Sequence, residues 1–188
     1  FSGTNFSRAI VQTADQETMV INAGYNGTIE VISPGTLTIT YTDTSRLPDT
    51  YDVNTTYNLD INIQSIPGNV IPSDKRQHFT GSLTLGDSVT SIEQYAFQYS
   101  QFTGDLIIPD KVTSIGYMAF DGCSGFTGSL TIGNKVQTIN QYAFNNCYGF
   151  TGNLTIPNSV TNLGNGAFQE CSGFTGSLTL SNIMTSIG

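Results

Sequence analysis

A pattern of 23 or 24 residues recurs along the second half of the chain, and this repeat constrains the fold more than any other feature. Each copy begins with a phenylalanine that is followed by threonine and glycine. These anchors are separated by 23, 24, 24 and 24 residues, and they are Phe79, Phe102, Phe126, Phe150 and Phe174. Periods in this range are typical of solenoids, in which a unit buries its apolar residues only by stacking on its neighbours.

Apolar residues recur at fixed offsets from each anchor. A leucine comes four residues after the anchor and a second aliphatic residue two positions later, as in Leu130 and Ile132. Because alternate residues of a strand share one face, this spacing predicts a short strand in every copy. An Ala-Phe pair such as Ala143-Phe144 closes each unit. We predict a mainly β solenoid of about four and a half repeats, with these core residues: Phe79, Leu83, Phe97, Phe102, Leu106, Phe120, Cys123, Phe126, Leu130, Phe144, Cys147, Phe150, Leu154, Phe168, Cys171 and Phe174.

The repeat resembles a known class. The segment Leu154–Leu180, LTIPNSVTNLGNGAFQECSGFTGSLTL, resembles the BspA-like leucine-rich repeat, whose pattern is roughly LxLPxSVxxIGxxAFxxCxxL. The first copy departs from the pattern, with Ser100 in the cysteine position and Glu93 where other copies have Gly116 or Gly164. Such departures suit a repeat that lies beside a cap. The resemblance covers residues 79–188 and implies an extracellular or surface-displayed bacterial protein that adheres to other macromolecules without catalysis.

Residues 1–78 lack the repeat but are rich in β-branched residues. Strand candidates at 18–21, 28–32, 36–41 and 58–63 are separated by turn signals, among them Ser33-Pro34-Gly35. We expect either a small Ig-like sandwich, which we favour, or a β cap on the first repeat. The predicted domains are residues 1–66, a linker at 67–78, and repeats at 79–188 that continue beyond Gly188, because solenoid ends need capping.

Charge and composition exclude several classes of protein. The net charge is −8, with eight acidic residues against four basic ones in residues 1–78 and six against two in 79–188. No basic patch exists for nucleic acid or anionic lipid. No apolar stretch reaches the length of a membrane span, and the N-terminus does not resemble a signal peptide. We therefore expect a monomeric mature or excised fragment without a transmembrane segment.

Residues for catalysis are scarce. The chain has one histidine, His78, and the sequence offers no recognisable Ser/His/Asp or Cys/His set, so we predict neither an enzyme nor a cofactor. Lys75-Arg76 beside it are interpreted as a solvated junction. The acidic loop at 43–52 could bind calcium, but its spacing matches no EF-hand and a solvated turn is preferred.

Cys123, Cys147 and Cys171 occupy one repeat position and should form a column inside the solenoid. We expect buried free thiols that act as small apolar side chains. Neighbouring coils are close enough that one disulfide stays open as an alternative. Zinc is not expected, because the nearby residues are Ser, Gly and Tyr.

Function is expected on the outward strand positions, which should form polar columns. The predicted ligand face consists of Ser82, Thr84, Asp105, Ser129, Thr131, Asn153, Thr155, Ser177 and Thr179. The main hypothesis is an adhesion module that binds host or bacterial surface proteins or extracellular polymers. Alternatives are a carbohydrate-binding module, in which Tyr95, Tyr99, Tyr142 or Tyr148 stack on sugars, and a stalk that displays other domains. Ice binding is disfavoured, because Ile107 and Gln137 interrupt the threonine columns.

Overall fold

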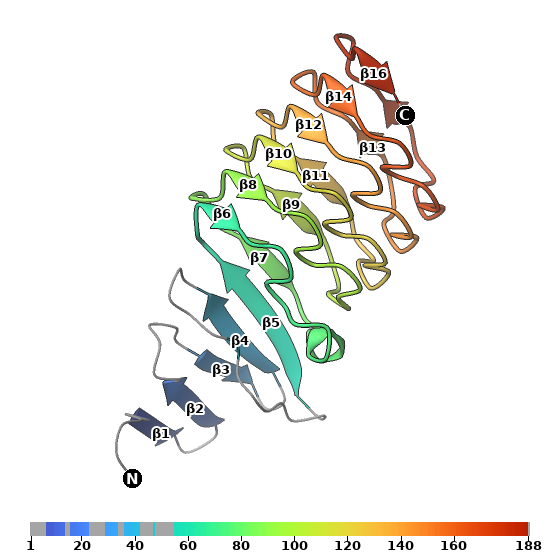
Figure 1. Cartoon of the computed structure of the whole chain (residues 1–188). Helices are drawn as coiled ribbons and strands as arrows, with labels where there is room; N and C mark the ends of the chain where they lie inside the picture. The colour runs from blue at the N-terminus through green and yellow to red at the C-terminus, as the bar shows by residue number, and fades with distance from the viewer. Residues whose placement is uncertain are drawn as a thin grey trace.

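The chain is a β-solenoid of six coils in a computed structural model that describes residues 7–13, 16–22, 29–33, 36–41, 47 and 55–187 (Figure 1). Coil 1 starts at residue 55, and coils 2 to 6 start at the anchor phenylalanines. Each coil contributes one strand to each of two sides. The described residues contain no α-helix, only the short 3₁₀ helix η1 at Arg76–His78.

One side of the solenoid is a six-stranded parallel sheet, which we call the continuous sheet. Its order is β16-β14-β12-β10-β8-β6, and its register aligns Ser91 with Ser114 and Ile92 with Ile115. Each of its strands is two residues long. They are β6 (Ser65–Ile66), β8 (Ser91–Ile92), β10 (Ser114–Ile115), β12 (Thr138–Ile139), β14 (Asn162–Leu163) and β16 (Ser186–Ile187).

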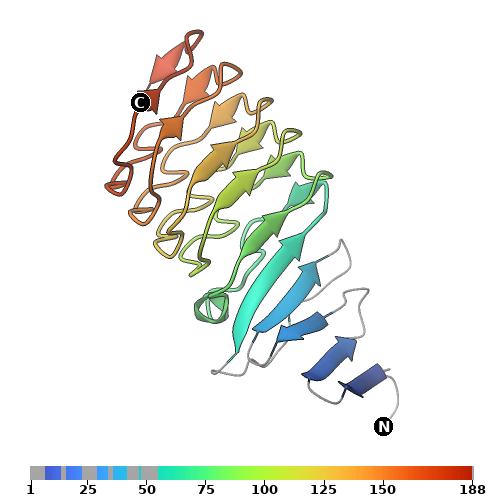
Figure 2. The same cartoon turned by 180° about the vertical axis from the view of Figure 1, so that it is seen from behind.

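The other side carries the strands that were predicted at the leucine positions (Figure 2). These strands are parallel but hydrogen-bond in pairs, β5 with β7, β9 with β11, and β13 with β15. The strands of this side are β5 (Thr56–Ile61), β7 (Leu83–Leu85), β9 (Leu106–Ile108), β11 (Leu130–Ile132), β13 (Leu154–Thr155) and β15 (Leu178–Thr179).

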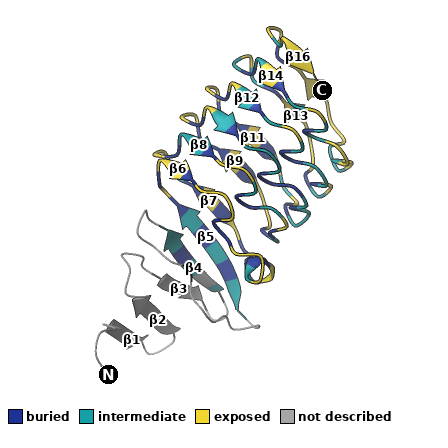
Figure 3. Cartoon of the chain, in the orientation of Figure 1, coloured by how far each residue is buried: buried dark blue, intermediate teal, exposed yellow. Residues whose placement is uncertain are grey.

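The core lies between the two sides and is built from columns of like residues (Figure 3). The Ala-Phe phenylalanines stack at 5.1 Å between ring centroids, with the rings of Phe120 and Phe144 only 3° from parallel. Parallel rings follow from exact repetition, since each coil places its ring over the same ring of the coil before. Ring stacks of this kind add to the apolar burial.

Most of the predicted core residues are fully buried, and the exceptions lie toward the last coil. Leu154, Phe168, Cys171 and Phe174 are only partly buried. In coil 6 the strand residues Leu178 and Ile187 are 61% and 65% exposed, because no further coil covers them.

The N-terminal strands extend the solenoid. They are β1 (Ser7–Thr13), β2 (Gln16–Asn22), β3 (Ile29–Ser33) and β4 (Thr36–Tyr41). β3 and β4 are antiparallel, as the Ser33-Pro34-Gly35 turn predicts, and β4 pairs in parallel with β5, which pairs with β7. Figure 1 shows β1 to β5 in one row that leads into β7. An Ig-like sandwich and the boundary at residue 66 stay predictions.

Residues 67–78, expected to form a linker, pack into the solenoid. Val70 and Ile71 belong to the same buried cluster as the phenylalanine columns. The expectation of a solvated junction is wrong for Arg76, which is only 7% exposed. Its guanidinium donates hydrogen bonds to the carbonyl of Ile71 at 3.1 Å and to Oδ1 of Asn69 at 2.8 Å. Burial lowers the Arg76 pKa.

Candidate binding faces

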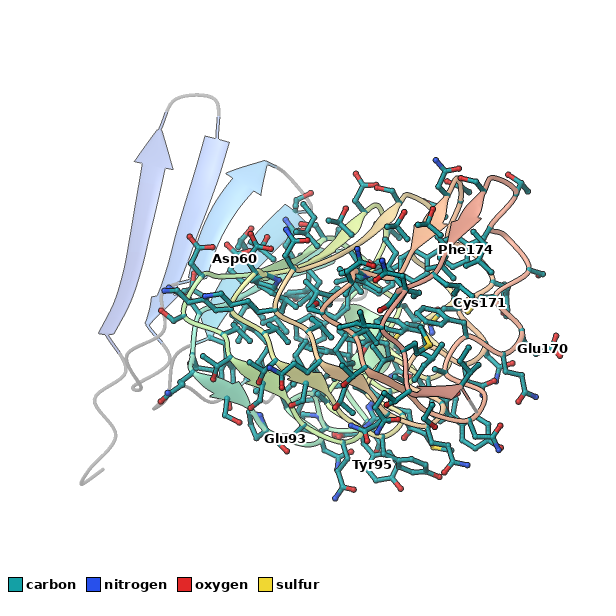
Figure 4. All side chains as sticks on the ribbon, turned by 90° about the horizontal axis from the view of Figure 1, so that it is seen from above. Asp60, Glu93, Tyr95, Glu170, Cys171 and Phe174 are labelled. Carbon is teal, nitrogen blue, oxygen red and sulfur yellow. The ribbon has the colours of Figure 1, made fainter. Side chains whose placement is uncertain are left out.

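The predicted ligand residues all lie exposed on the outer side of the leucine strands, and we call this surface the strand face. The leucines between them point inward, because side chains alternate along a strand. Figure 4 labels Asp60, which occupies the same register position in β5 as Thr84 in β7. The described structure thus places the predicted residues together on one surface, while their role in binding stays a prediction.

The strand face is held in register by side chains that bridge consecutive coils. Asp105 Oδ1 accepts hydrogen bonds from the backbone N–H of Ser129 at 2.6 Å and from its hydroxyl at 2.8 Å. Asn153 accepts from the Ser177 N–H at 2.8 Å in the same way. The two hydrogen bonds from Ser129 lower the pKa of the Asp105 carboxyl, and the backbone N–H contributes more than the hydroxyl. The polar columns are therefore ordered before any ligand arrives.

One apolar side chain interrupts the strand face. Ile107 is 60% exposed and pairs with Thr131 in the parallel ladder between β9 and β11. Interfaces typically combine a central apolar anchor with a polar surround. In the sequence, Ile107 is recognisable only as an interruption of the threonine column.

A second exposed surface lies on the segments that lead from the continuous sheet back to the strand face. We call it the tyrosine–amide face, and it consists of residues 93–101, 116–124, 140–148 and 164–172. In Figure 4, Glu93 and Tyr95 of this face lie on the opposite side of the solenoid from Asp60. The tyrosines of this surface are recognisable in the sequence, but the surface as a whole is not.

Backbone hydrogen bonds between coils fix the tyrosine–amide face. In coil 2 the N–H groups of Tyr95, Phe97 and Tyr99 donate to coil 3 carbonyls at 3.0, 2.8 and 2.7 Å. The same three bonds recur from coil 3 to coil 4 and from coil 4 to coil 5. This segment is therefore as regular as a strand, although its backbone is not extended.

Three tyrosines form a row across this face. The ring of Tyr117 meets the ring of Tyr95 at 5.4 Å and that of Tyr142 at 6.4 Å, both edge to face. All three are partly exposed, and none belongs to the core. Partial removal from water, with the neighbouring tyrosines, raises the Tyr117 pKa. Tyr99 and Tyr148 on the same face are each 55% exposed.

The backbone under this row is left-handed at residues other than glycine. Tyr95 has a φ of 59°, Tyr99 of 58° and Tyr142 of 56°, which cost free energy for a residue with a Cβ. Coil 5 has Gly166 at the position equivalent to Tyr142, and the Tyr142 ring covers the space that a Cβ on Gly166 would need. Glycine can therefore adopt the backbone conformation at this position without strain, whereas Tyr95 and Tyr142 adopt it and add a partly exposed ring.

Amide side chains surround the row. Gln94, Gln141, Asn165 and Gln169 are exposed. Beneath them, buried Asp121 accepts hydrogen bonds from Gln98 at 3.0 Å and from Asn145 at 2.8 Å, which ties coils 2, 3 and 4 together. The charged residues in these segments are all acidic, Glu93, Asp121 and Glu170. The face therefore presents rings and amides without a positive charge.

The cysteines form the expected column. Each thiol is free and donates to the carbonyl of a phenylalanine in the previous coil, Cys123 to Phe97 at 3.0 Å and Cys147 to Phe120 at 3.0 Å. Burial raises the pKa of the Cys123 thiol to about 12 and that of Cys147 further still. Within the described ranges, no three His, Cys, Asp or Glu side chains are placed to hold a metal ion.

The remaining predictions concern the junction and the acidic loop. His78 is partly buried at the end of η1. In the loop considered for calcium, all residues from 43 to 52 except Leu47 lie outside the described part of the chain. None of the helices described is long and apolar enough to cross a lipid bilayer.

Comparison with known families assigns the repeats. Residues 77–188 match the profile of the BspA type leucine rich repeat region in six copies, so the chain belongs to this family. The resemblance inferred from the sequence is thereby confirmed. No curated protein sequence matches the chain.

Two solved structures are similar to the chain. The pneumococcal vaccine antigen PcpA is similar with a TM-score of 0.51 and 16% identity, over 93% of this chain and 50% of that one. A leucine rich cell surface protein from Faecalibacterium prausnitzii has a TM-score of 0.47 and 17% identity, over 95% of this chain and 56% of its own length. The chain thus spans about half the length of these relatives. At this identity, the likeness to PcpA supports the fold alone.

Proposed function

We propose that the chain is a bacterial surface or secreted interaction module that adheres to host or bacterial surface proteins through its strand face. Membership of the BspA type family and the surface location named for one structural relative support this location. The observation that carries the proposal is the strand face itself, which holds exposed side chains in register from coil to coil with Ile107 among them.

The side chains of the strand face are ordered before they meet a ligand. A ligand that contacts the strand face does not need to immobilise Asp105 or Ser129, because hydrogen bonds between coils already hold them. Rigid surfaces lose less conformational entropy on binding, so modest contacts can give useful affinity. Exposed threonines on either side of Ile107 would exclude water from an apolar contact at the centre. Catalysis is not proposed.

The test is binding of the chain to an immobilised panel of extracellular matrix and bacterial surface proteins. Lysines at Thr131, Thr155 and Thr179 should abolish binding, because they place three charged side chains on the strand face. The matched control carries lysines at Thr127, Thr151 and Thr175, which are the same residue type in the same coils but precede the strands. Equal losses in both variants would show a charge effect and contradict the assignment. Absence of binding by the intact chain would favour a stalk.

A further inference from the structure

We infer that the tyrosine–amide face is a second binding site, which takes a neutral polysaccharide by stacking tyrosine rings on its sugars. This site is on different residues from the strand face and takes a different class of ligand, so it goes beyond the function proposed above. Four properties of the face support this site: a row of partly exposed rings, amide groups beside them, the absence of positive charge, and a rigid backbone.

The rings provide the apolar contact. Sugar rings have apolar C–H faces, and an aromatic side chain buries such a face while leaving the hydroxyls in water. Tyr95, Tyr117 and Tyr142 come from three successive coils, with 5.4 and 6.4 Å between neighbouring ring centroids. A polymer that runs along the solenoid axis would meet one ring after another, so affinity should grow with chain length.

The amides provide the polar contacts. A carboxamide offers two donors and an acceptor in one plane, which suits neighbouring hydroxyl groups on a sugar. Exposed Gln94 and Gln141 directly precede Tyr95 and Tyr142, and exposed Asn165 continues their column in the next coil. Coils 2, 4 and 5 therefore have an amide beside the ring row, and in coil 3 Tyr117 itself occupies this position.

The charge of the tyrosine–amide face favours a neutral glycan over other polymers. The four segments contain no lysine, arginine or histidine, and Glu93 and Glu170 are exposed. Anionic polysaccharides and nucleic acids would meet only like charge, which disfavours them. Cationic proteins are the remaining competitor. We prefer the glycan, because the exposed amides outnumber the two exposed carboxylates next to the rings.

Rigidity lowers the cost of binding. The backbone of the face is fixed by three hydrogen bonds from each coil to the next, and Asp121 ties the amides of Gln98 and Asn145 beneath it. The left-handed backbone at Tyr95 and Tyr142 holds these residues in a conformation that a residue with a Cβ does not prefer. The same position is left-handed in coils 2 to 5, at Tyr95, Met118, Tyr142 and Gly166, so this conformation belongs to the repeat and keeps the segments in register.

The experiment is a titration of the intact chain with neutral sugar hexamers: cellohexaose, laminarihexaose, maltohexaose and chitohexaose. Tyrosine fluorescence reports binding directly, since the chain has no tryptophan and five of its nine tyrosines lie on this face. We expect at least one hexamer to change the emission and to bind about tenfold more tightly than its disaccharide, as two further stacked rings would require. A hyaluronan hexamer and oligolysine serve as the anionic and cationic probes.

Variants assign the site. Tyr117→Ala combined with Tyr142→Gly should weaken hexamer binding about tenfold, and glycine suits the left-handed backbone at 142. Tyr117→Phe should retain binding, because it keeps the ring. Gln141→Ala with Asn165→Ala changes only exposed amides and should also weaken binding, even if the tyrosine variant does not fold. The lysine variant of the strand face should bind the hexamer normally.

Several results would overturn the inference. One is the absence of any fluorescence change with all four hexamers at millimolar concentration. Others are equal binding of the hyaluronan probe, or hexamer binding that survives both the tyrosine and the amide variants. If the tyrosine variant instead loses oligolysine or protein binding, the face belongs to a protein partner. The strand-face variants are tested on matrix proteins and the tyrosine and amide variants on sugar hexamers. A negative result with the hexamers therefore does not contradict the proposed function, and a negative result with the proteins does not contradict the glycan site.

Discussion

The two sides of the solenoid are built from the same repeat but bond differently. In the continuous sheet every coil hydrogen-bonds to the next, from β6 to β16. On the opposite side the coils bond two by two, β5 with β7, β9 with β11 and β13 with β15. The structural repeat on that side is therefore twice the sequence repeat, and the difference shows how single residues divide an otherwise uniform array.

Proline explains where the pairs end. Gly86 of coil 2 donates its N–H to the carbonyl of Ile61 in coil 1 at 2.7 Å. The equivalent residues of coils 3 and 5 are Pro109 and Pro157, which have no N–H to donate to the coil before. Within each pair, by contrast, an Asx residue such as Asp105 bridges to the next coil. Coils 2 and 3, and coils 4 and 5, are thus joined on this side by packing more than by a ladder.

The largest effect should follow from cutting the core at such a junction. Phe144 of coil 4 stacks on Phe168 of coil 5 at 5.1 Å, where the strand-face ladder is missing. Phe144→Ala leaves a buried cavity and should lower the free energy of unfolding by about 3–5 kcal/mol. Urea denaturation measures this. Phe174→Ala is the control, and its cost should be smaller because Phe174 is only partly buried. Equal losses of stability from the two substitutions would contradict the prediction that the phenylalanine core holds neighbouring pairs of coils together.

The cysteine column spans coils 3 to 5 and should make stability fall at alkaline pH. Burial raises the folded pKa of Cys123 to about 12 from an ordinary value of 9.0, so the unfolded chain releases this proton first. The contribution is therefore complete below pH 9 and is lost between pH 9 and 12, at about 1.4 kcal/mol per pH unit. Unfolding measured from pH 8 to 11 should show a shallower decline for Cys123→Ala than for the wild type. Parallel curves of unfolding free energy against pH for the variant and the wild type would contradict the assignment of this effect to Cys123.

A smaller, acid-dependent effect should be confined to the pair formed by coils 3 and 4. Hydrogen bonds from Ser129 lower the pKa of Asp105, so its contribution is present above the ordinary range of an aspartate and is lost as the pH falls through the folded pKa. The corresponding bridge at Asn153 does not titrate. Asp105→Asn should therefore reduce the acid sensitivity of the thermal midpoint, whereas Asn153→Asp should increase it. An unchanged acid profile in both variants would show that these bridges do not contribute.

The repeated features of the fold could be predicted from the sequence, and the features that occur once could not. Columns such as Phe120 and Phe144 are visible because the same residue returns at the same offset. Arg76 is a charged residue in a proline-bounded segment, and nothing in its sequence context indicates the carbonyl of Ile71 and the amide of Asn69 that make its burial acceptable. From the residue type alone, an arginine side chain is expected to be exposed to solvent.

The tyrosine row shows a second limit of aligned repeats. Tyr117 lies two residues before its Ala-Phe pair, whereas Tyr95 and Tyr142 lie one residue before theirs. It therefore aligns with Gln94 and Gln141, and only the edge-to-face packing in three dimensions places it in the row. The pairing of coils, by contrast, could have been found, because Pro109 and Pro157 alternate with glycine along the array.

The smallest effect on stability, and the sharpest test of the pairing, should come from Pro109→Thr. Threonine restores an N–H where coil 3 faces coil 2 and suits an extended backbone, so the ladder should extend across the junction. The gain of one hydrogen bond, about 1 kcal/mol, is largely offset by the greater freedom of the unfolded chain without proline, so the thermal midpoint should hardly move.

Hydrogen exchange is the decisive measurement, because the new amide at position 109 should be protected to the same degree as that of Gly86. Pro157→Thr provides the matched case between coils 4 and 5. An amide that exchanges at the rate of a surface loop in both variants would show that the coils stand apart for a reason other than the missing donor, and the ring stacks would then set their spacing.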